Sequence, residues 1–379
     1  MKHRLFQGMI FGIVGIGLSI GLFGKQIKAT DLDAMTEIIV EEMTLQQKIY
    51  QMFIVTPEAL SDSNPVISAG EITEDKLKEM PVGGIIYFKK NLLTPEQTKN
   101  MLFDMQRVSC DVERLPLFLC VDEEGGRVAR IGNQKAFGVP EIKSMAEIQS
   151  EEEAYQVGDT IGTYLSELGF NFDFAPDADV LTNQENQVIG ARSFGSNPLQ
   201  VAQFATAVSQ GLQANQILTA FKHFPGHGAT TGDTHEGFAY TDKSYEELLQ
   251  CELVPFAAAQ ENGIDAVMVA HIAVPNVTGS TIPSSLSYHM ITEILKGDLG
   301  YEGLVITDAL NMGAITKNFT TAQMAVLAVQ AGNDLLLMPE NLEEAVNSIL
   351  LAVETGQISE KRIDESVKKI VRKKLEMVK

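Results

Sequence analysis

Eight short apolar runs recur along the chain, and each is followed by a longer stretch that carries helical signals. Runs of four to eight residues that are apolar throughout are typical of parallel strands covered on both faces. Eight strands that alternate with helices predict an α/β protein, a (β/α)8 barrel of the TIM type with room for irregular early units. The runs occupy residues 51–55, 82–88, 117–121, 170–175, 217–221, 264–270, 304–307 and 334–338.

Helix start and stop signals fill the segments between these runs. A serine or threonine N-cap with a polar partner three residues later predicts a helix start, and a glycine after the last turn predicts its end. The predicted starts are Thr94 with Gln97, Ser150 with Glu153 and Ser244 with Glu247, and the predicted end glycines are Gly169, Gly263, Gly332 and Gly356.

The pattern of the first 30 residues predicts a targeting segment that precedes the barrel. Lys2 and Arg4 come before an apolar run over residues 5–24, an arrangement that the secretion machinery recognises. The run is also long enough to span a bilayer, so a cleaved signal peptide and a retained membrane anchor both fit. We therefore expect an exported protein at the extracellular or cell-wall face, in which residues 31–379 form one barrel domain and only the first segment meets a membrane.

The charge balance excludes one class of partner. Four basic and no acidic residues lie among the first 29, which leaves 25 basic against 50 acidic residues in the remainder. Such an excess of negative charge repels phosphate backbones, so we expect no nucleic-acid partner. The three cysteines show no metal-ligand spacing, and we expect a monomer that uses neither a metal ion nor a cofactor.

Polar residues interrupt the apolar pattern where the predicted strands end. In a (β/α)8 barrel the chemistry takes place at the carboxyl ends of the strands. Four of the six histidines, a lysine and several carboxylates fall at these ends, so this mouth of the barrel is the predicted active site. They are Asp122, Asp173, Asp177, Asp179, Lys222, His223, His227, His235, His271 and Asp308.

Asp308 and the pair Asp233–His235 are the candidates for bond cleavage. Asp308 ends an apolar strand near predicted cations that keep a carboxylate ionised, as the nucleophile of a retaining glycosidase must be; an N-cap is the structural alternative. His235 follows Asp233 by two residues in a glycine- and threonine-rich loop over 229–240. A carboxylate at this spacing is able to orient the imidazole and stabilise its cationic form for acid–base work.

Two arginines and an aspartate near the mouth have a structural as well as a binding interpretation. Arg130 and Arg192 are candidates for contacts with hydroxyls or carboxylates, because a guanidinium donates in a fixed fork; a structural salt bridge is the alternative. Asp179 is expected to hold a turn or to pair with an arginine. Gly125 and Gly126 predict a tight backbone turn, since their spacing does not match a nucleotide-binding motif.

Four motifs resemble glycoside hydrolase family 3, and more narrowly its single-domain β-N-acetylglucosaminidases. They are VDEEGGRVAR at 121–130, ARSFG at 191–195, KHFPGHG at 222–228 followed by Asp233-Thr234-His235, and VITDALNM at 305–312. The resemblance implies Asp308 as the nucleophile, His235 as the acid/base and Asp233 as its partner. It also implies that five residues hold the terminal sugar, namely Asp122, Arg130, Arg192, Lys222 and His223.

The activity that this resemblance implies is retaining exo-hydrolysis of terminal β-linked N-acetylglucosamine, from cell-wall muropeptides or chitooligosaccharides, through a glycosyl-aspartate intermediate. A carbohydrate is then the expected partner. Two departures from the family pattern are visible: Glu123 stands where glutamine is frequent, and Glu236-Gly237-Phe238 replaces a leucine-proline after the histidine. Neither changes the proposed chemistry, but the second alters the loop that carries His235.

Three other functions use the same residues. A metal-dependent hydrolase on the same barrel would ligate zinc through histidines at the strand ends, although the sequence has no H-x-H after the first strand. A phosphorylase would release the glycosyl-enzyme with phosphate in place of water. A catalytically inactive wall-binding protein would have lost a catalytic side chain, whereas every proposed one is present.

Overall fold

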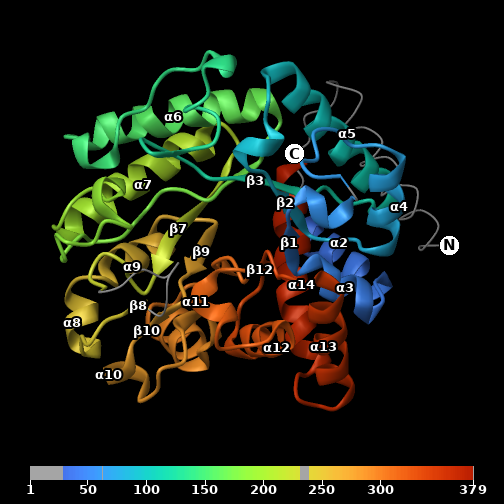
Figure 1. The fold of residues 1–379 in the computed structure, drawn as a ribbon. Coiled ribbons are helices and arrows are strands. Elements are labelled where there is room, and N and C mark those ends of the chain that lie inside the picture. Colours follow the sequence, from blue (N-terminus) through green and yellow to red (C-terminus); the bar gives the residue numbers. More distant parts are fainter. Residues whose placement is uncertain (1–28, 62, 231–238, 379) are drawn as a thin grey trace.

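Eight parallel strands form the single large sheet of the computed structural model, which describes residues 29–61, 63–230 and 239–378 (Figure 1). Along the sheet the order is β11-β9-β7-β6-β3-β2-β1-β12. A parallel bridge from Ile306 to Leu335 joins its two ends, so the sheet closes into the predicted barrel. The strands are β1 (Phe53–Val55), β2 (Gly84–Ile86), β3 (Phe118–Val121), β6 (Phe172–Asp173), β7 (Leu218–Phe224), β9 (Ala266–Val269), β11 (Leu304–Thr307) and β12 (Leu336–Leu337).

Seven of the predicted apolar runs contain one of these strands in full, and β7 begins within the run over 217–221 and continues three residues beyond it. β1, β2, β3, β9, β11 and β12 are buried at every position, as expected for strands with the barrel interior on one side and helices on the other. Edge-to-face contacts of Phe172 with Phe118 (5.6 Å between centroids) and with Phe174 (5.0 Å) fill part of the core.

Helices surround the barrel, and the segments at the two ends of the described chain lie side by side (Figure 1). α2 (Ala29–Glu42) and α3 (Leu45–Gln51) precede the barrel and contact the last helix. The outer layer then follows the strand order. It comprises α4 (Glu71–Glu79), α5 (Pro95–Glu113), α6 (Glu151–Leu168), α7 (Pro198–Ala214), α8 (Tyr245–Gln250), α9 (Val254–Glu261), the π-helical segment η7 (His289–Asp298), α11 (Gly313–Thr316), α12 (Thr321–Ala331), α13 (Leu342–Glu354) and α14 (Glu360–Met377).

The predicted helix caps are confirmed, with one difference in detail. Thr94, Ser150 and Ser244 each accept a hydrogen bond from the backbone N–H three residues later. Of these three caps, Ser244 with Glu247 alone forms the reciprocal capping box. The partner side chains at the other two caps accept instead from the residue before the cap. The four predicted end glycines all have positive φ.

Short elements extend the carboxyl ends of the strands and shape the mouth. β4 (Glu123–Gly125) and β5 (Val128–Ala129) form an antiparallel hairpin directly after β3. Its turn requires the two glycines, with φ of 91° at Gly125 and 53° at Gly126, as predicted. β8 (Ala239–Tyr240) pairs with β10 (Ile272–Ala273) beyond β7 and β9.

Two parts of the sequence prediction concern residues that lie outside the described ranges. Residues 1–28 hold almost all of the expected targeting segment, and residues 231–238 include Asp233 and His235. Within the described ranges no helix combines the length and the apolar character needed to cross a bilayer.

Candidate active site

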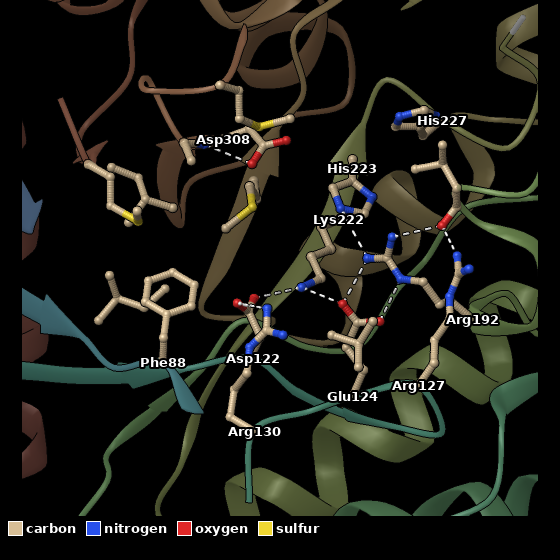
Figure 2. Close-up of a pocket in the computed structure, with 18 of the residues that line it drawn as sticks. Phe88, Asp122, Glu124, Arg127, Arg130, Arg192, Lys222, His223, His227 and Asp308 are labelled. Carbon is tan, nitrogen blue, oxygen red and sulfur yellow. Dashed lines mark hydrogen bonds and ion pairs between the residues drawn. The ribbon is translucent and has the colours of Figure 1, made fainter. Parts of the chain in front are cut away.

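A cavity of about 580 Å³ opens at the carboxyl ends of the strands, where the sequence predicted the active site. Its residues come from β2, β3, β7, β9, β11 and β12 or from the segments that follow these strands and β6. One wall is charged and the opposite wall is largely apolar (Figure 2). The polar lining residues are Asp122, Glu124, Arg127, Arg130, Gln187, Arg192, Lys222, His223, His227, Asp308 and Asn311.

Asp308 lies at the end of β11, and its backbone and its carboxylate are both held (Figure 2). Its N–H donates to the carbonyl of Val269 at the end of the neighbouring strand β9 (2.8 Å). Its Oδ1 accepts from the N–H of Ala309 (2.7 Å). The structure therefore holds this carboxylate in the cavity wall on a rigid strand end, and it does not use Asp308 as an N-cap for the helix that follows.

An unbroken chain of opposite charges forms the charged wall. Lys222 Nζ contacts both Asp122 Oδ1 (3.1 Å) and Glu124 Oε1 (2.6 Å). Arg130 pairs with Asp122 (3.1 Å), and Arg192 grips both oxygens of Glu124 (2.8 Å each). Side chains from separate strands thus fix one another's orientation. The most specific of these contacts is the pair of parallel hydrogen bonds between the planar guanidinium and the carboxylate.

These pairs decide the charge states in the wall. Burial alone would raise the pKa of the Glu124 carboxyl, but Arg192 and Lys222 outweigh burial and hold the pKa well below its usual range. Burial would likewise raise the pKa of Asp122, which Lys222 and Arg130 lower. Burial opposes the charge of Lys222, yet Glu124 and Asp122 raise its pKa above the ordinary value. The wall therefore presents fixed anions and cations to a bound molecule.

His223 is held by an aspartate on one side and an arginine on the other. Its Nδ1 lies 2.7 Å from Asp179 Oδ2, and its Nε2 lies 3.3 Å from Arg192 Nη2. Because a carboxylate only accepts and a guanidinium only donates, the neutral ring carries its proton on Nδ1. Burial, followed by the charge of Arg192, lowers the pKa of His223 to about 4.

One of the two structural roles predicted for Asp179 is confirmed. It was expected to hold a turn or to pair with an arginine, and the turn is present, since Asp179 Oδ1 accepts from the backbone N–H groups of His223 (3.3 Å) and His227 (2.5 Å). Its side-chain partner, however, is the His223 imidazole. Arg192 instead pairs with Glu124 and approaches Asp177 (3.4 Å).

One group of side chains in the described ranges has the composition of a metal site. Asp177, Asp179 and His223 bring ligand atoms within 4.8 Å of one another, and all three are buried. A cation there would have to displace the proton between His223 and Asp179 and would face the Arg192 guanidinium. Asp179 is already hydrogen-bonded to His223 and Arg192 already approaches Asp177, so these residues fit a hydrogen-bonded support for His223 better than a metal centre.

The opposite wall offers apolar and aromatic surface. Phe88, Met312 and Met338 line it, and the Arg130 guanidinium lies 5.5 Å from the centre of the Phe88 ring. Met338 has a φ of 50°, a left-handed conformation that is unusual for a residue with a side chain. Backbone of this kind is concentrated at functional sites. The complete apolar set is Ile86, Phe88, Val128, Val188, Met268, Ala309, Met312, Leu337 and Met338.

The structure brings together the six described residues with a predicted catalytic or sugar-binding role, whereas four others predicted at the mouth do not line the cavity, namely Asp173, Asp177, Asp179 and His271. Asp122, Arg130, Arg192, Lys222, His223 and Asp308 line this one cavity. Sequence reasoning missed Glu124, which connects Lys222 to Arg192. The available signal was the alternation of side chains along a strand, which places adjacent residues on opposite faces. Glu123 indeed faces away, where it accepts from Ile131 N–H (2.9 Å), Gly132 N–H (2.7 Å) and the Tyr164 hydroxyl (2.8 Å).

Two known proteins are similar to this chain in sequence. The "Beta-hexosaminidase A" of Pseudoalteromonas piscicida is 33% identical over 322 residues, which is 78% of this chain and 54% of that protein. The "Beta-hexosaminidase LpqI" of Mycobacterium tuberculosis is 31% identical over 335 residues, which is 86% of this chain and 81% of that protein. This chain thus spans about half the length of the first of these relatives.

A solved structure and a family profile agree with these relatives. A glycoside hydrolase family 3 β-N-acetylglucosaminidase from Paenibacillus sp. str. FPU-7 superposes with a TM-score of 0.82 at 36% identity, covering 88% of this chain and 63% of the other. Residues 44–373 match the profile described as "Glycosyl hydrolase family 3 N terminal domain". This match takes in every strand of the barrel and every described polar residue of the cavity. The chain therefore belongs to glycosyl hydrolase family 3.

Proposed function

We propose that this protein is a retaining exo-β-N-acetylglucosaminidase, which releases terminal β-linked N-acetylglucosamine through a glycosyl ester on Asp308. The observation that carries the proposal is the position of Asp308 in the wall of a cavity that also contains a fixed chain of ion pairs. A strand-end carboxylate with one oxygen held by a backbone N–H is well placed to attack an anomeric carbon. The relatives named above support the substrate class.

In the proposed mechanism the charged wall holds the sugar and Asp308 reacts with it. The hydroxyls of the terminal sugar bind Asp122, Arg130 and Lys222, whose charges are fixed by one another. Asp308 forms a bond to the anomeric carbon while the bond to the leaving oxygen breaks and that oxygen takes up a proton. A water molecule then attacks the glycosyl ester, gives up a proton and restores the free carboxylate.

The proton donor in this proposal is His235, supported by Asp233, and both lie outside the described residues. Two other histidines line the cavity, and both are poor donors at neutral pH. Burial lowers the pKa of His223 to about 4 and also lowers the pKa of His227. A donor that comes from the loop after β7 is therefore consistent with the protonation states of the described site.

The apolar wall favours an acetamido sugar over a plain glucoside. Phe88, Met312 and Met338 provide surface for the C–H face of the ring and for the methyl of an N-acetyl group. The cavity volume of about 580 Å³ is in the range that encloses a small ligand. We further propose that the natural substrates are muropeptides or chitooligosaccharides and that the protein acts outside the cytoplasm, after export directed by residues 1–30.

The first test compares two substrates that differ at one position of the sugar. Purified protein is incubated with an aryl β-N-acetylglucosaminide and with the matching aryl β-glucoside, each with and without phosphate. We expect hydrolysis of the acetamido sugar, little turnover of the glucoside and no sugar phosphate. Preference for the glucoside would contradict the substrate class, and a sugar 1-phosphate product would replace hydrolysis by phosphorolysis.

The second test separates the nucleophile from the acid. Asp308→Asn should abolish turnover of every aryl N-acetylglucosaminide, because no glycosyl ester forms. His235→Ala should lower kcat/KM by about 100- to 10,000-fold for substrates with poor leaving groups and leave kcat/KM nearly unaffected for strongly activated ones, since formation of their glycosyl ester needs no proton. Equal losses on an activated substrate would refute the role given to His235, and a trapped intermediate on any residue other than Asp308 would refute the mechanism.

A further inference from the structure

His271 follows the last residues of β9, where the sequence placed it at the mouth, but its side chain does not line the cavity. It is fully buried, behind the segment that carries Asp308. Both ring nitrogens have partners: Nδ1 lies 2.7 Å from the Ser285 hydroxyl, and Nε2 lies 3.0 Å from the carbonyl oxygen of Ala309. Both ring nitrogens of His271 are thus hydrogen-bonded directly behind the proposed nucleophile, and sugar binding does not account for this arrangement because the side chain does not reach the cavity.

The two contacts define which nitrogen carries the proton. A carbonyl oxygen only accepts, so Nε2 donates to Ala309 and the neutral ring leaves Nδ1 to accept from the Ser285 hydroxyl. Burial lowers the pKa of His271, which keeps the ring neutral at ordinary pH. Ser285 is itself held, because its N–H donates to Ala270 (3.1 Å) and its carbonyl accepts from Asn333 (2.8 Å). The imidazole is therefore fixed in orientation and in tautomer.

The hydrogen bond to Ala309 completes a set of three tethers on consecutive residues. Asp308 donates its N–H to Val269 (2.8 Å), and Leu310 donates its N–H to Leu337 at the end of β12 (2.8 Å). Between these two bonds, the carbonyl of Ala309 is held by His271. The N–H of Ala309 in turn holds Oδ1 of Asp308 (2.7 Å; Figure 2). Rotation of the Ala309 backbone would move that N–H, so the His271 bond restricts the rotation of the carboxylate.

We propose that His271 is a positioning residue for the nucleophile, which acts through the Ala309 backbone without touching the sugar. The inference rests on the proposed function, since it takes Asp308 as the attacking group. A carboxylate that is free to rotate spends less time aimed at the anomeric carbon, and a misplacement of about 1 Å is enough to cost roughly 100-fold in rate. Loss of the tether should therefore slow bond formation at Asp308 and leave sugar binding unchanged.

A matched pair of substitutions tests this at one buried position. In His271→Gln the side-chain amide reaches the place of Nε2 and is able to donate to Ala309, whereas in His271→Asn it reaches only the place of Nδ1. The measurement is covalent inactivation by a fluorinated N-acetylglucosaminyl fluoride, which forms the ester on Asp308 without needing an acid. It reports separately the inactivation rate constant and the binding constant of the inhibitor.

We expect His271→Asn to lower the inactivation rate constant roughly 10- to 100-fold, and His271→Gln to remain within about threefold of the wild type. Both variants should keep the wild-type binding constant. For aryl substrates with different leaving groups, His271→Asn should lower kcat/KM by a similar factor throughout. Loss of the acid would instead spare the substrates with activated leaving groups. A wild-type inactivation rate in His271→Asn, equal losses in both variants, or a loss confined to binding would overturn the proposal.

Two controls keep this result separate from misfolding and from the proposed function. Ser285→Ala retains the imidazole but removes the donor that fixes its tautomer, and it should give a smaller loss in the same rate constant; an unchanged rate would also overturn the proposal. Circular dichroism reports whether each variant folds. Mapping the label in the wild type to a residue other than Asp308 would refute the proposed function, whereas labelled Asp308 with an indifferent His271 would refute only this inference.

Discussion

Glu123 and Glu124 are neighbours in the chain, yet their carboxylates face opposite sides and have different partners. Glu124 faces the cavity, where it connects Lys222 to Arg192. Glu123 faces the opposite side of the hairpin strand and accepts two backbone N–H groups together with the Tyr164 hydroxyl. Burial raises the pKa of Glu123, while the two cations lower the pKa of Glu124. The pair allows site chemistry and local stability to be tested on adjacent residues.

Glu124→Gln should weaken the site more than the fold. The neutral amide gives up the charge-assisted contacts to both cations, which keep only Asp122 beside Lys222 and Asp177 near Arg192 as carboxylate partners in the described ranges. We expect a loss of roughly 100-fold in kcat/KM, which is about 2.7 kcal/mol of transition-state stabilisation. Steady-state kinetics on an aryl N-acetylglucosaminide measures this loss. A variant with wild-type kcat/KM would show that the chain of ion pairs does not support the sugar.

Glu123→Gln is the matched control, and its effect should appear in stability. The amide NH2 group cannot accept from the backbone donors that Glu123 satisfies, and an unsatisfied buried group costs about 1 to 3 kcal/mol. We expect a lower Tm by thermal denaturation and an unchanged KM. If Glu123→Gln loses activity as severely as Glu124→Gln at equal stability, the assignment of the two faces is wrong.

At the scale of elements, the segment after β7 lies tightly against the loop after β6. An ideal Cβ added at Gly228 would lie 2.1 Å from the carbonyl oxygen of Val180, a distance that neither backbone permits. The N–H of Asn183 donates to the carbonyl of Gly228 (3.0 Å) at the same crossing. This contact joins the loop after β6, which carries Asp179, to the segment that continues from β7, where His223 lies in the strand and His227 just beyond it.

Gly228→Ala should therefore damage both stability and activity. The added methyl forces the loops apart at a cost of about 1 to 3 kcal/mol, and it lengthens the bonds from Asp179 to the histidine segment. Thermal denaturation and kcat/KM measure the two effects. The matched control is Gly70→Ala, since an added Cβ at Gly70 meets no atom within 4 Å; comparable losses in both variants would mean that the crossing is not tight.

The elements were far more predictable than the contacts within the site. Each strand is buried on both faces, so it leaves an apolar run in the sequence, and Asp308 and Lys222 mark the points where such runs meet the polar mouth. The pairs Arg192–Glu124 and His223–Asp179 join residues 68 and 44 positions apart. No local pattern encodes them, because they depend on how two loops approach each other after the barrel closes. For this reason the sequence predicted the turn that Asp179 holds but not its imidazole partner.

At the scale of the whole molecule, the two ends of the barrel differ in how they accommodate buried charged residues. The carboxyl-terminal mouth balances buried charges with ion pairs, whereas the amino-terminal end contains a buried lysine. Lys374 of α14 is fully buried, donates to Gln51 Oε1 (2.7 Å) and lies 5.3 Å from the centre of the Phe118 ring. Burial lowers its pKa to about 7, against the weaker opposing effects of Glu113, Cys110 and Cys120.

This lysine should make the stability of the protein depend on pH in the alkaline range. The unfolded chain keeps the Lys374 proton up to the ordinary pKa of about 10.4, while the folded protein releases it from about pH 7. Between these values the unfolded state binds more protons, so stability rises with pH by up to about 1.4 kcal/mol for each pH unit. Below pH 7 both states bind the proton, and the full penalty for burying the charge is present.

Lys374→Met removes the titrating group and keeps most of its volume. From pH 7 to pH 9 the free energy of unfolding of the wild type should therefore rise relative to that of the variant. Denaturant unfolding at several pH values measures this difference, in which the titration of groups common to both proteins cancels.

Lys373→Met is the control. Burial would lower the pKa of Lys373, but Asp265 and Glu376 outweigh burial and raise this pKa, so Lys373 does not titrate between pH 7 and pH 9. The expected curves for Lys373→Met and wild type are parallel. If the curve for Lys374→Met is parallel to them as well, then Lys374 keeps its proton in the folded barrel and the closed amino-terminal end tolerates a buried charge.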